Sequence, residues 1–184
     1  MAAPARAAMM RKELLSTPIP PRLAARPRDR RGFPIPYGTL CADDGTPDFR
    51  VTDIERWIDA VNRRLCGLCG CTLGRRLAFV GGTRSHESRT FTDLPMHREC
   101  AEYALRVCPY LAMPNMTHAQ KVTAQAEFLL ASAFVTSERP ERFALGITTG
   151  FDVLQHGVEY LLRAQPWLES VWWKDGAPLE AGSL

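Results

Sequence analysis

Four regularly spaced residues constrain the fold of this chain more than any other feature. Cys66 and Cys69 form a Cys-x2-Cys pair, and after 27 intervening residues His97 and Cys100 form a His-x2-Cys pair. Two such pairs of thiolate and imidazole donors are typical of tetrahedral zinc sites. Four protein ligands leave no position open for water, so the spacing predicts a structural Zn2+ bound by Cys66, Cys69, His97 and Cys100.

The segment before the first pair predicts a helix. Thr52-x-x-Glu55 is a capping box, and apolar residues follow it at helical spacing. The helix is expected to lead directly into Cys66, where Gly67 and Gly70 help the backbone to curl around an ion. The apolar residues expected on its buried face are Ile54, Trp57, Ile58, Val61 and Leu65.

The segments between the two pairs predict the rest of a zinc module. Leu77–Gly81 and Arg89–Thr92 are typical of short strands, and we expect them to pair as a hairpin. A second helix is expected to begin around Asp93–Met96, so that His97 and Cys100 point the same way from its first turn. A knuckle, a β-hairpin and then a helix that supplies the second ligand pair make a treble-clef-like arrangement.

The remainder of the chain predicts a mixed extension. A further helix is expected over about Thr117–Val135, and Phe143–Thr149 and Val158–Leu162 are expected to form a C-terminal β-hairpin. Trp167, Trp172 and Trp173 are expected on a short helix or turn that covers this hairpin. The predicted fold class is therefore α+β.

The expected domain organisation follows from charge and proline content. Residues 1–31 contain eight basic and two acidic residues and are rich in proline, which predicts a disordered basic arm. Residues 32–184 are expected to form a single zinc-stabilised domain. Its zinc module is expected over about residues 52–111, and its helix and hairpin extension over about residues 115–176. Phe33–Tyr37 alternates proline with large apolar residues, which predicts an extended strap across the body.

Three further cysteines leave the ligand set open to alternatives. Cys71 lies two residues beyond Cys69, and Cys108 lies on the second predicted helix. If His97 proved exposed, Cys108 is the expected replacement ligand, and Cys71 is a second alternative. With Cys41, the chain also contains enough thiols for an iron–sulfur site, although the His-x2-Cys pair suits zinc better.

Several classes of protein are disfavoured. No run of about 18 apolar residues is present, so no membrane span is expected. The N-terminal residues lack the apolar core of a secretory signal, and clustered cysteines in a reducing compartment favour metal binding over disulfides. We therefore expect a cytoplasmic protein. The chain contains no phosphate loop, nucleophile elbow or dinucleotide fingerprint.

An enzyme remains the alternative hypothesis. His86 and Glu87 lie in the predicted hairpin loop, followed by Arg89, and His118 lies on the third predicted helix. A pocket between the zinc module and the C-terminal hairpin would bring such residues together, for example in a divergent treble-clef nuclease. That nuclease pattern also needs a carboxamide on the second helix, and no Asn or Gln is present there before Asn115.

Motifs along most of the chain resemble one family. The segments that carry the likeness are Arg31–Tyr37, Pro47–Arg50, Leu65–Gly70, Leu73-Gly74, Ala78–Val80, His97-x2-Cys-Ala101, Cys108–Leu111 and Trp172-Trp173-x2-Gly176. They are similar to a group of small uncharacterised zinc-binding proteins of actinobacteria and bacteriophages. The resemblance implies a zinc-stabilised fold and a phage or mobile-element origin, and it implies no particular activity. Cys71 departs from the family pattern.

The expected function is that of an interaction protein. The basic arm and the exposed face of the zinc-stabilised domain are expected to bind a protein or a nucleic acid.

Overall fold

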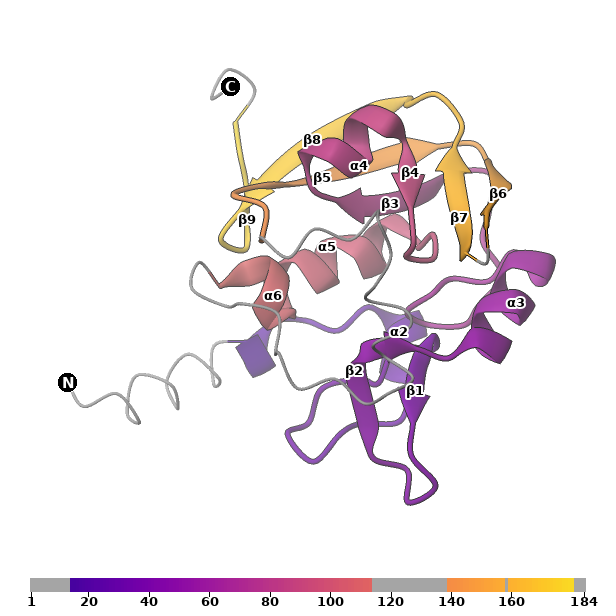
Figure 1. Ribbon diagram of the computed structural model, residues 1–184. Coiled ribbons are helices and arrows are strands. Elements are labelled where there is room, and N and C mark those ends of the chain that lie inside the picture. The colour runs from indigo at the N-terminus through magenta and orange to yellow at the C-terminus, as the bar shows by residue number, and fades with distance from the viewer. Residues whose placement is uncertain (1–13, 114–138, 158, 181–184) are drawn as a thin grey trace.

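The computed structural model describes residues 14–113, 139–157 and 159–180. In this part of the chain, three small antiparallel sheets and five labelled helices form a mixed α+β fold, as the sequence predicts (Figure 1). The strands from β3 onward and α4 lie above α5 in the figure, and α2, β1, β2 and α3 lie below it.

The central sheet contains two strands, β3 and β5, that are nearly continuous apolar runs. Its order is β3-β5-β8-β9, and every neighbouring pair is antiparallel. All six residues of β5 are buried, which requires cover on both faces of the sheet. Helices α4 and α5 provide it, since each contacts β3 and β5 and they lie on opposite sides of the sheet in Figure 1. The bounds are β3 Leu77–Gly81, α4 Thr83–Ser88, α5 Arg98–Val107, β5 Phe143–Thr148, β8 Glu169–Lys174 and β9 Ala177–Pro178.

A second sheet has the order β4-β7-β6. It consists of β4 (Thr90–Phe91), β7 (Glu159–Ala164) and β6 (Phe151–His156). Its inner side meets the aromatic core around Phe79, whose ring stacks on Phe91 at 4.7 Å between centroids. Phe79 has no exposed surface, so this contact lies at the centre of the core.

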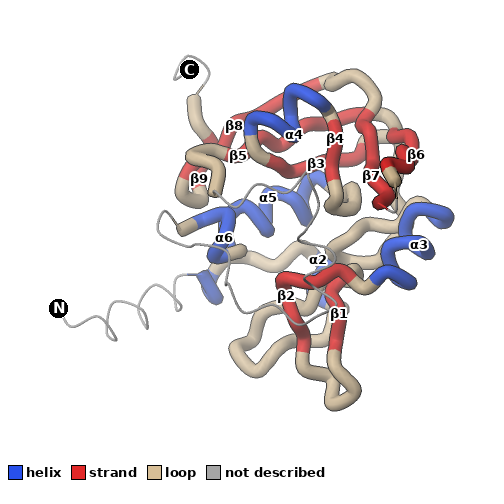
Figure 2. The backbone as a smooth tube through the Cα atoms, viewed as in Figure 1, coloured by secondary structure: helices blue, strands red, loops and turns tan. Residues whose placement is uncertain are grey.

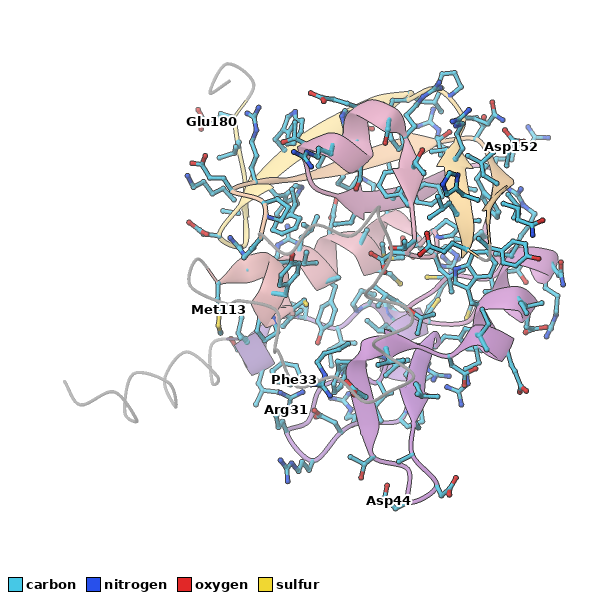
Figure 3. All side chains as sticks on the ribbon, in the orientation of Figure 1. Arg31, Phe33, Asp44, Met113, Asp152 and Glu180 are labelled. Carbon is cyan, nitrogen blue, oxygen red and sulfur yellow. The ribbon has the colours of Figure 1, made fainter. Side chains whose placement is uncertain are left out.

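The N-terminal half contributes a hairpin and a helix beside it. β1 (Thr39–Cys41) pairs with β2 (Pro47–Thr52), and Asp44 lies at the tip of this hairpin (Figure 3). Helix α3 (Ile54–Arg63) follows, and α6 (Pro109–Ala112) extends α5 after a break at Cys108.

The predicted first helix is confirmed, but its cap and buried face differ from the expectation. Asp53, not Thr52, is the N-cap, and its carboxylate accepts hydrogen bonds from the backbone N–H groups of Glu55 and Arg56. Trp57 and Ala60 are buried, whereas Ile54 and Ile58 are 54% and 50% exposed. The helix is therefore rotated relative to the predicted apolar stripe.

Residues 14–31, expected to belong to a disordered arm, instead pack on the domain. Helix α2 (Pro21–Ala24) inserts Leu23, which is 2% exposed, into the core. The N–H of Ile35 then donates to the carbonyl of Pro27 at 2.8 Å, which holds the extended strap against this segment. The expectation overlooked a buried leucine within a proline- and arginine-rich stretch. Residues 1–13 lie outside the described part of the chain.

The predicted hairpin between the ligand pairs is wrong. β3 pairs with β5, β4 pairs with β7, and the polar residues between β3 and β4 form α4. Two neighbouring strands pair as a hairpin only when the connection turns them toward each other. Here α4 intervenes, and each strand finds a partner more than 50 residues away along the chain.

The C-terminal hairpin is also formed differently. β6 pairs with β7 around a turn at Gly157, whereas β5 joins the central sheet. β6 was not predicted, and its mostly exposed residues explain why an apolar pattern missed it. Trp172 and Trp173, expected on a helix or turn, lie on strand β8, and Trp167 precedes that strand. The helix predicted over about Thr117–Val135 lies outside the described residues.

Candidate metal centre

The first ligand pair lies in a tight turn between α3 and β3. This stretch contains no helix or strand (Figure 2), but hydrogen bonds close it on itself. The N–H of Gly70 donates to the carbonyl of Cys66 at 2.8 Å, and the N–H of Cys66 donates to that of Cys71 at 2.8 Å. These bonds hold Cys66 and Cys69 on the inside of one turn.

A glycine is needed in this turn for two reasons. Gly70 has φ of +75°, a conformation that L side chains rarely adopt. A Cβ at Gly70 would also lie 2.7 Å from the Tyr37 ring, which packs directly on the turn. The strap that carries Tyr37 is held there by its N–H, which donates to the carbonyl of Leu68 at 2.8 Å. The strap and the knuckle therefore support each other.

The second ligand pair is carried to the knuckle by β3. Met96 and Ala78 exchange two backbone hydrogen bonds of 2.8 Å, and the N–H of Gly67 donates to the carbonyl of Pro95 at 2.9 Å. His97 is consequently the N-cap of α5, and Cys100 lies in its first turn. The helix begins later than predicted, at Arg98, yet both ligand residues still point to the knuckle.

The four predicted ligands come together. The donor atoms of Cys66, Cys69, His97 and Cys100 all lie within 4.8 Å of one another, and all four residues are buried. Donor atoms at the corners of a tetrahedron about 2.3 Å from a central ion lie about 3.8 Å apart. A small inward adjustment of the side chains would therefore complete the coordination sphere of a metal ion.

His97 is oriented by a contact outside the cluster. Its Nδ1 lies 3.4 Å from the Sγ of Cys69, and its Nε2 lies 3.1 Å from the carbonyl oxygen of Thr72. A carbonyl only accepts, so Nε2 carries the proton and Nδ1 offers its lone pair to the cluster. A backbone carbonyl that fixes the tautomer in this way is typical of histidines that bind metals.

The pKa values of two thiols in the cluster are shifted in opposite directions. Hydrogen bonds from the thiols of Cys100 and Cys69 lower the pKa of Cys66 to about 3, and backbone N–H groups add to this while burial opposes it. The hydrogen bond to Cys66 is the main cause that raises the pKa of Cys100, because it stabilises the protonated donor. A metal ion that binds here replaces these protons.

The other cysteines lie outside this cluster. Cys71 is exposed, Cys108 and Cys41 are half-buried, and none of them is among the four clustered donors. Desolvation of the Cys108 thiol raises its pKa, which is typical of an unreactive cysteine. His97 is only 6% exposed, so the condition under which Cys108 would replace it is not met.

Positive charge lies close to the cluster. Arg26 stands over the Tyr37 ring at 5.6 Å and donates from Nε to the carbonyl of Ile35 at 3.0 Å. Burial is the main cause that lowers the pKa of Arg26, and the nearby charge of Cys69 opposes this effect. Cys71 is exposed, but partial desolvation of its thiol raises its pKa. The charges of Arg22 and Arg26 oppose that rise. Both arginines therefore flank the knuckle on the side of α2.

The residues proposed for an enzyme do not gather at the metal centre. His86 lies on α4, where its ring stacks on Trp167 at 5.2 Å and its Nε2 lies 2.8 Å from the Oγ of Ser170. Burial lowers the pKa of His86. Glu87 is exposed, and Arg89 caps the same helix at its C-terminus. His118 lies outside the described residues.

An open hollow lies between the knuckle segment and the C-terminal sheets. It has a volume of about 490 Å³ and is lined by Arg64, Leu73, Gly74, Arg75 and Thr149. The sequence analysis did not select these residues. The arginine pair directly after the knuckle, Arg75-Arg76, was the available signal. The hollow occupies the place expected for a pocket, but none of the residues proposed for catalysis lines it.

In the described residues, no helix combines the length and apolar character needed to cross a bilayer. Comparisons of the chain with protein-family models, with curated proteins and with solved structures found no significant match.

Proposed function

We propose that the four-residue cluster holds one structural Zn2+. The support is the closed set of buried donors, three thiolates and one imidazole whose Nδ1 lone pair faces them. Such a site carries a net charge of about −1 when Zn2+ is bound by three thiolates. The N-terminus of α5 and the guanidinium of Arg26 both favour that charge.

The proposed zinc module is treble-clef-like in its ligand-bearing parts. A knuckle supplies one pair, and the start of a helix supplies the other. Between them, β3 and its bridge to Met96 take the role that a paired hairpin has in a treble clef. The likeness to actinobacterial and phage proteins, and the origin that it implies, stay predictions.

We further propose that the zinc-stabilised domain binds nucleic acid. The observation that carries this proposal is the set of arginines around the knuckle. Arg22, which pairs with Glu99 at 2.9 Å, and Arg26 flank it on one side, and Arg64 and Arg75 line the hollow on the other. Within the described part of the chain, neither Arg64 nor Arg75 forms an ion pair with a carboxylate. Clustered arginines without acidic partners are typical of surfaces that bind phosphate backbones.

The test is binding of the full chain to a short DNA duplex and to a single-stranded RNA, at about 50 to about 200 mM salt. We expect the logarithm of the binding constant to fall linearly with the logarithm of salt, by about 0.9 for each duplex phosphate contacted. An acidic polypeptide of equal charge represents a protein partner. Binding to the polypeptide but to neither nucleic acid would contradict the proposal.

A further inference from the structure

The hollow beside the knuckle is built by the end of α3. Arg64 follows the helix with φ of +53°, and its carbonyl accepts a hydrogen bond of 2.7 Å from the N–H of Leu73. This bond ties the chain after the knuckle back to the helix. Leu73 itself is 6% exposed, so its side chain forms part of the core below the hollow. Arg64 and Arg75 are thereby brought to one depression although they are 11 positions apart.

The two arginines of the hollow lack acidic partners among the described residues, in contrast to Arg63. Arg63 forms an ion pair with Asp59 at 3.2 Å, one helical turn away. Arg64 instead lies over the Phe151 ring at 5.8 Å, which holds its guanidinium without neutralising it. Arg75 is exposed and has no ion pair among the described residues. Two arginines without acidic partners among the described residues thus line the same open hollow.

Neutral donors complete the lining. Thr149, which carries a hydroxyl, is a lining residue, and the backbone N–H groups of Gly74 and Arg75 donate no hydrogen bond to another residue of the described chain. A Cβ at Gly74 would meet nothing within 4 Å, so the backbone at this point is open to a ligand. Guanidinium forks, a hydroxyl and free N–H groups are the donors that phosphate oxygens accept from.

We infer that this hollow binds a phosphate group in the backbone of a nucleic acid. The inference rests on the nucleic-acid binding proposed above and assigns one contact of that surface. The hollow is an open depression of about 490 Å³, as a contact to an extended sugar–phosphate backbone requires. The metal centre positions the site, because the segment 70–75 leaves the knuckle directly into the hollow.

The test compares the salt dependence of binding by the wild-type chain and two matched arginine variants. Arg75→Gln removes a charge from the hollow, and Arg84→Gln removes one from α4, where Arg84 is also exposed. We expect Arg75→Gln to weaken binding of the DNA duplex several-fold and to reduce the salt slope by about 0.9. Arg84→Gln is expected to leave the slope unchanged. Zinc content and circular dichroism confirm that each variant is folded.

Thr149→Val tests the contribution of the Thr149 hydroxyl to binding while the arginine charges are kept. The side chain keeps its shape, so we expect weaker binding with an unchanged salt slope, because a neutral donor releases no counterion. Equal affinity and slope for wild type and Arg75→Gln would overturn the inference while leaving nucleic-acid binding intact. Absence of binding by the wild-type chain would instead contradict the proposed function, and the inference with it.

Inorganic pyrophosphate distinguishes the two sources of phosphate. If pyrophosphate competes with the duplex for the wild-type chain, and Arg75→Gln weakens this competition, the result supports a phosphate-binding site within the nucleic-acid surface. Saturable binding of pyrophosphate to the hollow by a chain that binds no nucleic acid would assign a free phosphate ligand and overturn the inference as stated. The Nε–H resonances of Arg64 and Arg75 report this binding directly.

Discussion

The Nε2–H of His97 donates to the carbonyl of Thr72 across 3.1 Å, while Nδ1 of the same ring faces the thiol of Cys69. Thr72 follows the knuckle in sequence, so the first ligand pair orients a member of the second. The acceptor is backbone, and its position depends on the fold of the knuckle rather than on the threonine side chain. The cluster is therefore pre-organised around a single tautomer.

This relationship predicts how His97 binds the metal. We expect long-range proton–nitrogen spectra of the zinc-loaded protein to show His97 protonated at Nε2 and coordinated through Nδ1. His97→Ala should lower zinc affinity by more than tenfold, because it removes one of four ligands. His86→Ala is the control, since His86 lies on α4 and should leave zinc content unchanged. Coordination through Nε2 would contradict the orientation described above.

We predict that some of the cysteines bind the metal and that others do not. Elemental analysis of purified protein should give about one zinc per chain, lost in Cys66→Ser and in Cys100→Ser. Cys71→Ser and Cys108→Ser should retain the metal, because both residues lie outside the cluster. Loss of zinc from either of these two variants would redefine the ligand set, and iron in place of zinc would redefine the site.

Because residues 14–31 pack on the domain, we predict that truncation of Leu23 strongly lowers the free energy of unfolding. Because Leu23 is 2% exposed, Leu23→Ala should lower the free energy of unfolding by about 2–5 kcal/mol. Leu15→Ala is the matched control. Leu15 is 42% exposed, so its truncation should change stability by about 0.5 kcal/mol or less. The measurement is urea denaturation of the zinc-loaded chain. If both variants change the free energy of unfolding by similarly small amounts, residues 14–31 do not pack on the domain in solution.

A close contact across the central sheet makes Gly146 sensitive to substitution. A Cβ at Gly146 would lie 2.6 Å from the Trp167 ring, which is rigid and itself packed on Phe79. Gly146→Ala should therefore destabilise the fold by about 1–3 kcal/mol in urea denaturation. Gly74→Ala has open space around the new methyl group and should be close to neutral. Equal stability of the two variants would contradict the position of Trp167.

His86 makes stability depend on pH near neutrality. Burial lowers the pKa of His86 in the folded state below its value of 6.5, while the charge of Glu87 opposes this shift. The unfolded chain therefore binds the proton more readily. The contribution of His86 is complete above pH 6.5 and is lost as pH falls through the lower folded pKa.

The measurement is the free energy of unfolding at pH 7 and pH 5 for wild type and His86→Gln. We expect a larger loss at pH 5 for wild type, because glutamine keeps a polar partner for Ser170 but does not titrate. Comparison of the two proteins cancels the effect of acid on the metal site. An identical decrease in both would show that His86 is equally protonated in the folded and unfolded states.

Local patterns were sufficient to predict some features of the fold. The helix over Ile54–Arg63 is confirmed because helical spacing of apolar residues and a polar N-terminal signal act within a few residues, although the cap is Asp53 and the buried face is rotated. β3 and β5 are confirmed as strands because they are short runs that are almost wholly apolar. In each case, the interactions that determine the element lie within it.

Strand pairing and the residues around the hollow were not predictable in the same way. β3 and β4 are neighbours in sequence, yet each pairs with a strand beyond residue 142. Arg64 and Arg75 carry no pattern that relates them, and only the bond between Leu73 and Arg64 brings them to one hollow. The burial of Leu23 likewise depends on a surface formed by distant segments.

The sequence by itself determined the four candidate ligands, because a Cys-x2-Cys turn and a His-x2-Cys helix start each place two donors together through local geometry alone. Only the tertiary structure decided how the two pairs meet. That step needs β3 to pair with Met96 and the knuckle to accept the N-terminus of α5, and both are contacts between segments far apart in the chain. The orientation of His97 and the open arginines of the hollow follow from the same contacts.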